Sequence, residues 1–196
     1  ISEFDVTVAV SSPASPKDYT ALPASVTIPA GSASATLPVY VLNDSYDEYD
    51  ETLTVSLGAI TANGDSQFAL GASSGSISII DDDALPKISI NDVTIDPEGA
   101  SASTRTAHFT VSLDRATEKT VRIDYATSDD TAVAGADYLY ASGTHTFDTV
   151  THETSFTIEV TVNGDELVEG DELFDVDLVL MNGDAAVIKK GVGVTT

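Results

Sequence analysis

The feature that most constrains the fold of this sequence is a regular alternation of apolar and polar residues along most of its length. A period of two is typical of strands that bury one face, and no stretch shows the period of about 3.6 residues that marks an amphipathic helix. Turn-forming pairs such as Asn63-Gly64 and Asn163-Gly164 separate the alternating segments. We therefore expect an all-β fold of short antiparallel strands, arranged as a sandwich or a barrel. The clearest alternating segments are residues 4–10, 35–41, 53–57, 107–113, 156–162 and 174–178.

The two halves of the sequence repeat one another. Asp18-Tyr19 is matched by Asp137-Tyr138 at an offset of 137 − 18 = 119, and Asp44 is matched by Asp165 at an offset of 165 − 44 = 121. The difference of two residues corresponds to one loop of different length. In each half, the acidic cluster that begins at Asp44 or Asp165 lies between two alternating segments, so we expect it to occupy a loop between strands.

A run of three acids marks the junction of the two copies. Asp81-Asp82-Asp83 follows the alternating segment 76–80, and the next strand is expected within a few residues, over 87–90. We therefore expect two domains, residues 1–83 and 84–196, stacked end to end with little freedom to swivel.

The order and spacing of several motifs in the two copies resemble the Calx-beta domain. The resemblance implies immunoglobulin-like antiparallel β-sandwiches of about seven strands, here two in tandem. Many members of this family bind Ca²⁺ in loops at one end of the sandwich. The motifs are Pro97-Glu98-Gly99, Gly135-Ala136-Asp137-Tyr138, Asp165-x-x-x-Glu169-x-Asp171-Glu172 and the acidic triplet that closes the first copy.

The first copy departs from this pattern because it lacks the first two strands. The second copy has expected strands at 88–95 and 107–113 before the one at 121–125, whereas residues 1–10 align with that third strand. Either those strands come from residues outside this sequence or from another chain, or the sequence is a window cut from a longer tandem array. The second copy departs in another way, because no acidic triplet follows its last expected strand, at 191–196.

Calcium is the metal that the acidic residues favour. Ca²⁺ takes six to eight oxygen ligands, and carboxylates crowded within about 4–6 Å repel one another unless a cation neutralises them. The alternative is that these acids only solvate loops, and Glu51 and Glu172 are weaker candidates for that reason. We expect the first site to be the tighter one. The ligands that the resemblance implies are Asp18, Asp44, Glu48, Asp81, Asp82 and Asp83 in the first copy, and Glu98, Asp137, Asp165 and Glu169 in the second.

The charge of the chain excludes several classes of partner. With 8 basic and 32 acidic side chains the formal net charge is −24, which disfavours binding to nucleic acid or to an anionic membrane surface. The absence of cysteine excludes disulfides and thiolate metal sites. The sequence holds no apolar run of about 18 residues and no signal-peptide pattern, so we expect neither a membrane span nor a secretory leader within it.

The sequence does not favour an enzyme. Residues 71–75 match G-x-S-x-G formally, but no helical segment follows to form a nucleophile elbow, so we interpret them as a turn.

These observations predict a calcium-binding structural or adhesive segment of a larger secreted or cell-surface protein, in which Ca²⁺ stiffens the junction between domains. Two alternatives stay open: a regulatory Ca²⁺ sensor pair of a transporter, and a non-catalytic carbohydrate-binding accessory module. The expected partners are calcium ions and neighbouring repeats of the same chain, and a further protein or carbohydrate surface is not excluded.

Overall fold

The computed structural model places all regular structure of the described residues in β-strands. The described part of the chain contains no helix of the length and apolarity that a membrane span requires. The chain forms two compact units, which do not strictly follow chain order: the first is Ile1–Ser45 with Tyr49–Asp82, and the second is Tyr46–Glu48 with Asp83–Thr196. The residues described are 4–11, 17–62, 69–96, 99–166, 170–182, 186–188 and 192–195.

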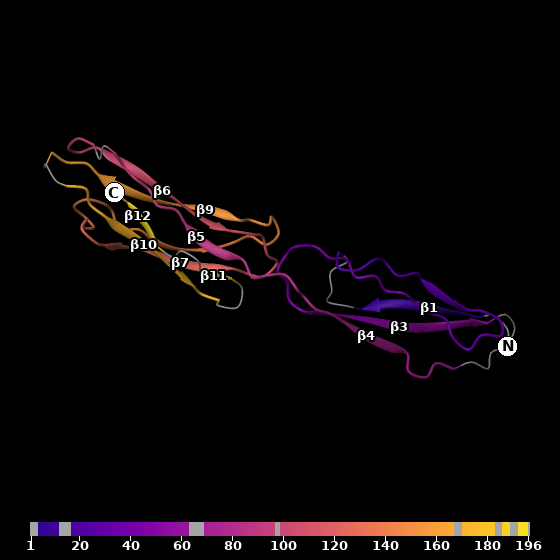
Figure 1. The fold of residues 1–196 in the computed structure, drawn as a ribbon. Coiled ribbons are helices and arrows are strands. Elements are labelled where there is room, and N and C mark those ends of the chain that lie inside the picture. Colours follow the sequence, from indigo (N-terminus) through magenta and orange to yellow (C-terminus); the bar gives the residue numbers. More distant parts are fainter. Residues whose placement is uncertain are drawn as a thin grey trace. The chain divides into compact units, whose positions relative to one another are not determined.

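The first unit contains one four-stranded antiparallel sheet, in the order β2-β1-β3-β4 (Figure 1). Strands β1 and β3 are central, and a register shift between Val6 and Val8 interrupts their ladder. Among the described residues of this unit, only Val6 and Leu53 are buried apolar side chains. The strands are β1 (Phe4–Ser11), β2 (Ser25–Ile28), β3 (Glu51–Ala62) and β4 (Ser74–Ile79).

The second unit is a sandwich of two four-stranded sheets, in the orders β12-β10-β7-β8 and β11-β5-β6-β9. Apolar side chains from both sheets form one core, in which Phe109 of β6 and Phe174 of β10 meet edge to face at 6.0 Å. All strand pairs are antiparallel except β5 and β11. The strands are β5 (Lys87–Ile90), β6 (Thr104–Leu113), β7 (Arg122–Asp129), β8 (Ser142–Thr146), β9 (Ser155–Asn163), β10 (Phe174–Leu180), β11 (Val187–Ile188) and β12 (Val192–Thr195).

The two units repeat one sheet. Strands β1, β2, β3 and β4 occupy the same order, with the same antiparallel pairing, as β7, β8, β10 and β12. The prediction of an all-β fold with an internal repeat is confirmed.

Five of the six clearest alternating segments are strands as predicted, and the strand expected over residues 35–41 is absent. In that segment only Val41 makes a β-bridge, to Tyr19. Its apolar residues keep their spacing, and Leu37 and Val39 are half-buried. A strand needs a neighbour to supply its hydrogen bonds, and among the described residues this segment has none beyond the bridge.

Candidate metal centre

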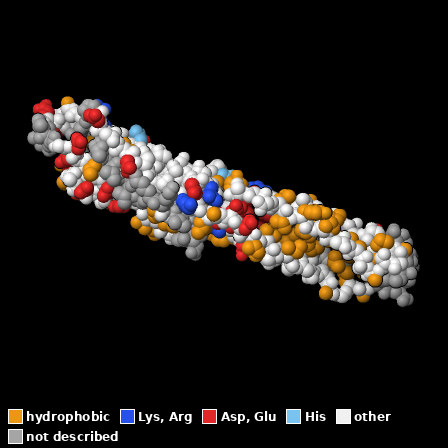
Figure 2. All heavy atoms as spheres, in the orientation of Figure 1, with side chains coloured by type: hydrophobic (Ala, Val, Ile, Leu, Met, Phe, Trp, Pro, Cys, Tyr) orange, Lys and Arg blue, Asp and Glu red, His pale blue; other side chains and the backbone are white. Residues whose placement is uncertain are grey.

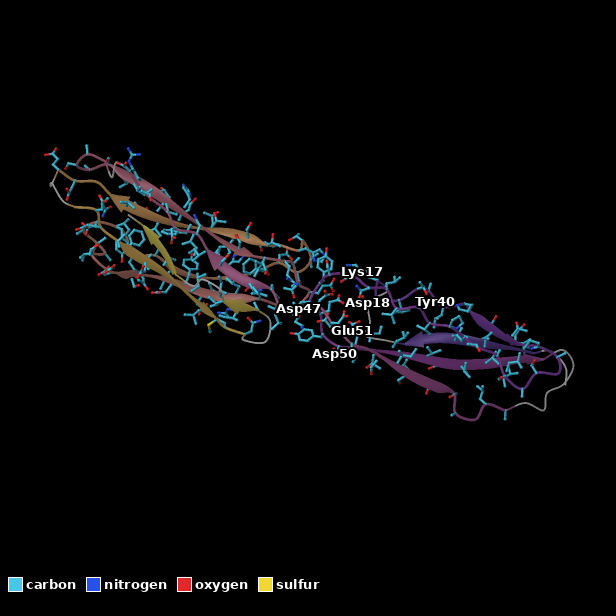
Figure 3. All side chains as sticks on the ribbon, viewed as in Figure 1. Lys17, Asp18, Tyr40, Asp47, Asp50 and Glu51 are labelled. Atoms are coloured by element: carbon cyan, nitrogen blue, oxygen red, sulfur yellow. The ribbon has the colours of Figure 1, made fainter. Side chains whose placement is uncertain are left out.

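The acidic segments of the first unit meet at one end of its sheet. Strand β3 begins at Glu51 and β4 ends at Ile79, and these two residues are paired across the ladder. The acidic loop before β3 and the start of the acidic triplet after β4 therefore lie at the same end. The backbone N–H of Asp81 donates to Oδ1 of Asp50 at 3.1 Å, and Figure 3 shows Asp50 and Glu51 at this end.

Asp18 joins this acidic end from a different loop. The N–H of Leu42 donates to the carbonyl oxygen of Asp18 at 2.8 Å, which fixes Asp18 opposite a segment that leads directly into Asp44. Asp18 is only 6% exposed, and its Oδ2 atom has no hydrogen-bond partner among the residues that the structure describes. A buried carboxylate oxygen without a partner is costly, so this position favours a cation or a donor that would satisfy it.

The remaining predicted ligands of the first copy do not close a coordination shell around Asp18. Across the described ranges, no three carboxylate, imidazole or thiol side chains form a group that could hold a metal ion. Asp44 and Asp82 are exposed, whereas Asp81 is half-buried. Glu48 and Asp83 are half-buried as well, but they belong to the second unit.

In the second unit, the aspartate that matches Asp18 already has a hydrogen-bond donor. Asp137, which matches Asp18, accepts the N–H of Val133 through Oδ2 at 2.7 Å. Asp165 is exposed at the end of β9. Glu98 and Glu169 lie outside the described residues, so their role as ligands stays a prediction. The two copies therefore differ at the equivalent aspartate, because Asp137 has a backbone partner and Oδ2 of Asp18 has none.

The most buried acid in the described chain is Asp47, which was not among the predicted site residues. Its side chain is 2% exposed, and its Oδ1 atom lies 2.7 Å from Nζ of Lys119. Thr117 donates its hydroxyl to the carbonyl oxygen of Asp47 at 2.7 Å, and Glu118 donates its N–H to the same oxygen at 3.1 Å. The segment Tyr46–Glu48 is thereby an integral part of the second unit.

One sequence signal could have singled out Asp47. The offset of 121 residues takes it to 47 + 121 = 168, which is a valine, so the acid occurs in only one of the two copies. An acid that the repeat does not require is more readily explained by a role specific to one copy.

A partly buried polar contact fixes the loop after β7. The Tyr138 hydroxyl donates to Oδ1 of Asp129 at 2.5 Å, and the N–H of Ala134 donates to the same oxygen at 2.9 Å. These hydrogen bonds lower the pKa of Asp129. Burial, and then the hydrogen bond to the Asp129 carboxylate, raise the pKa of Tyr138 to about 12. The ring of Tyr138 stacks on Phe174 at 4.1 Å, so this contact connects the loop to the core.

This contact predicts a stability change at high pH. Because the folded pKa of Tyr138 is raised from 10.0 to about 12, its contribution to stability is complete below about pH 10 and is lost as the pH rises toward 12. We expect Tyr138→Phe to be less stable than the parent by about 1 kcal/mol at pH 8, in urea unfolding. That difference should shrink between pH 10 and pH 12. A difference that stays constant over this range would show that the Tyr138 hydroxyl does not titrate as the contact requires.

A comparison with protein-family models matches the Calx-beta domain model twice, to residues 6–83 and 90–194. The chain belongs to the Calx-beta domain family. The resemblance to this family that the sequence motifs indicated is therefore confirmed. A comparison with curated proteins gave no match.

Three solved structures are similar to this chain at low sequence identity. The CBD12 pair from CALX1.2 is 17% identical with a TM-score of 0.43, over 99% of this chain and 87% of that chain. The apo form of the Calx CBD1 domain is 16% identical with a TM-score of 0.41, over 57% of this chain and 96% of that chain. The CBD12 calcium-binding domain of CALX1.1 is 19% identical with a TM-score of 0.37, over 91% of this chain and 66% of that chain.

Proposed function

We propose that this Calx-beta pair binds Ca²⁺ at the acidic end of its first unit and serves as a structural or adhesive segment of a larger secreted or cell-surface protein. In this proposal Asp18 supplies a buried ligand, and Asp44, Asp81 and Asp82 of the same unit are further ligands. Bound Ca²⁺ would stiffen the chain between β4 and β5, because the triplet lies in that connection.

The observation that carries the proposal is the buried Asp18 carboxylate. Within the described ranges its Oδ2 atom has no hydrogen-bond partner, and the sheet register brings Asp50 and Asp81 to the same end of the unit. Hard carboxylate oxygens are the ligands that Ca²⁺ prefers, whereas a redox metal would favour thiolates or imidazoles. A cation there would offset the desolvation of Asp18 and the mutual repulsion of its acidic neighbours.

The proposal predicts opposite effects of Asp18→Asn with and without metal. Ca²⁺ at about 100 times its Kd should stabilise the parent by about 2.7 kcal/mol, and Mg²⁺ should stabilise it less because it dehydrates reluctantly. In EGTA we expect Asp18→Asn to be at least as stable as the parent, since the amide removes a buried negative charge. Adding Ca²⁺ should raise the melting temperature of the variant much less than that of the parent. Thermal unfolding of both proteins in EGTA, Mg²⁺ and Ca²⁺ measures these differences.

Two controls separate the first site from the second. Calorimetric titration should lose its tight phase when Asp81, Asp82 and Asp83 are all replaced by alanine, whereas Asp165→Ala should leave that phase almost unchanged. Equal melting temperatures of the parent in EGTA and in millimolar Ca²⁺ would refute calcium binding. Loss of the tight phase in Asp165→Ala alone would instead place the principal site in the second unit.

The proposed stiffening is tested by X-ray scattering, in which chelation should broaden the distance distribution.

A further inference from the structure

Strand β8 forms an edge of the second unit. It pairs with β7 on one side, from Ser142 to Thr146, and it ends the sheet β12-β10-β7-β8. Nowhere in the described parts of the chain does a strand or an isolated bridge pair with its other side. The strand therefore presents a row of unpaired backbone groups, which is a template for pairing with another strand.

The hydrogen bonds to β7 show which backbone groups of β8 lie on the open side. The N–H of Thr127 donates to the carbonyl oxygen of Ala141 at 2.9 Å, and the N–H of Phe147 donates to that of Val121 at 3.0 Å. Successive residues of a strand direct their N–H and C=O groups to opposite sides, so the odd-numbered residues of β8 face β7. The exposed residues whose backbone groups lie on the open side are Ser142, Thr144 and Thr146.

The open edge of β8 carries none of the features that usually block pairing with another chain, which are a charge, a proline or a bulge. Its sequence is Ser-Gly-Thr-His-Thr, and its ladder with β7 has no register shift. The edge strand β9, by comparison, carries Glu159, whose side chain is 69% exposed. Acidic side chains are spread over the face of the second unit that Figure 2 shows, and the chain holds 32 of them. Two copies of the chain can therefore approach at β8 without setting acids of this strand against each other.

The side chains between the outward-facing residues hold this edge in place. The ring of His145 stacks on Phe156 at 3.8 Å and meets Phe147 edge to face at 5.1 Å. Gly143 packs against the Tyr125 ring, where a Cβ atom would lie 2.6 Å from the Tyr125 hydroxyl oxygen. An edge that is already ordered loses little conformational entropy when it binds a partner.

We propose that β8 is a self-association edge, at which two copies of this chain pair antiparallel about a two-fold axis at Thr144. In this arrangement Thr144 of one copy lies opposite Thr144 of the other, and Ser142 lies opposite Thr146. This register pairs all three outward-facing residues, whereas a shift along the strand would leave some of them unpaired. The interface uses the open edge of both copies, so it closes as a dimer. This inference is independent of calcium binding.

The acid beside the centre of this edge does not oppose the pairing. Asp124 of β7 lies opposite Thr144, and its Oδ1 atom accepts the Thr144 hydroxyl at 2.6 Å. In the dimer the two copies of Asp124 are separated by three strand spacings of about 4.8 Å, roughly 14 Å in all. The Debye length at physiological ionic strength is about 8 Å, so their repulsion is largely screened. The contact is small, so we expect a transient dimer that weakens at low salt.

The experiment compares the full chain in EGTA at micromolar and at millimolar concentration. Sedimentation should show a monomer at the low concentration and a dimer at the high one. Amide hydrogen exchange at Ser142, Thr144 and Thr146 should slow by about tenfold or more in the dimer. Exchange at Gly143 and His145, whose N–H groups face β7, provides an internal reference and should not change.

Three variants test the geometry of the pairing. Thr144→Pro removes an outward N–H and no hydrogen bond to β7, so it should fold as the parent does and stay monomeric. Thr144→Lys keeps the backbone but places two like charges opposite each other, so it should also prevent the dimer. Thr110→Lys makes the same change at an exposed position of β6, away from the edge, and should leave the dimer unchanged.

A parent chain that stays monomeric at millimolar concentration would overturn the proposal. So would a dimer that persists in Thr144→Lys, or one that leaves the three edge amides unprotected, because the contact would then lie elsewhere on the chain.

Discussion

Replacing Asp47 by alanine is expected to lower the unfolding free energy of the second unit by about 3–5 kcal/mol. The Lys119 side chain is 12% exposed and its Nζ pairs with Oδ1 of Asp47 at 2.7 Å, so the substitution removes a buried carboxylate that stabilises a largely buried positive charge. It also removes the carboxylate that Thr117 contacts at 3.1 Å. Urea unfolding followed by hydrogen exchange in β7 and β10 reports on this unit.

Two further variants separate the ion pair from a general loss of packing. Asp44→Ala removes an exposed acid from the same loop and should change stability in EGTA by less than about 0.5 kcal/mol. The double variant Asp47→Ala, Lys119→Met should recover much of the loss, since it removes both charges. If the double variant is as unstable as Asp47→Ala alone, the loss of the Asp47–Lys119 ion pair is not the cause.

A loss of similar size, about 3–5 kcal/mol, is expected for Phe174→Ala. The residue is 1% exposed, stacks on Tyr138 and meets Phe109 of the opposite sheet, so its removal leaves a cavity between the two sheets. Val179→Ala, on the same strand, is the matched control because Val179 is 56% exposed. Equal effects of the two substitutions on the urea midpoint would contradict the assigned core.

Local periodicity was sufficient to predict most of the fold. Strands β1, β3, β6, β9 and β10 follow directly from alternation. In β6, β9 and β10 the alternating apolar residues are buried in the core of the second unit. Residues 35–41 show the limit of that reasoning. Alternation specifies which side chains turn inward, but a strand also needs a partner for its backbone, and no local pattern reveals whether that partner is present.

The candidate site, too, could be predicted from the sequence only in part. The resemblance to the Calx-beta domain placed Asp18 and Asp81 in one set of candidate ligands, and the pairing of Glu51 with Ile79 brings Asp81 to the same end as the acidic loop before β3. The sequence could not identify the Asp47–Lys119 pair, because the two residues are 72 positions apart and nothing in either local pattern connects them. Burial of a charge is decided by which distant segment covers it.

The place of Tyr46–Glu48 in the second unit bears on how such repeats can be inherited. A duplication or recombination event that copied residues 84–196 as one block would carry Lys119 but leave Asp47 behind. The copied block would contain Lys119 without the Asp47 carboxylate, and it would be less stable unless the sequence before it supplied an equivalent acid. A repeat of this kind therefore cannot be moved freely to a new position in the chain. In related repeats, a lysine at the position of Lys119 should occur together with an aspartate about 72 residues before it.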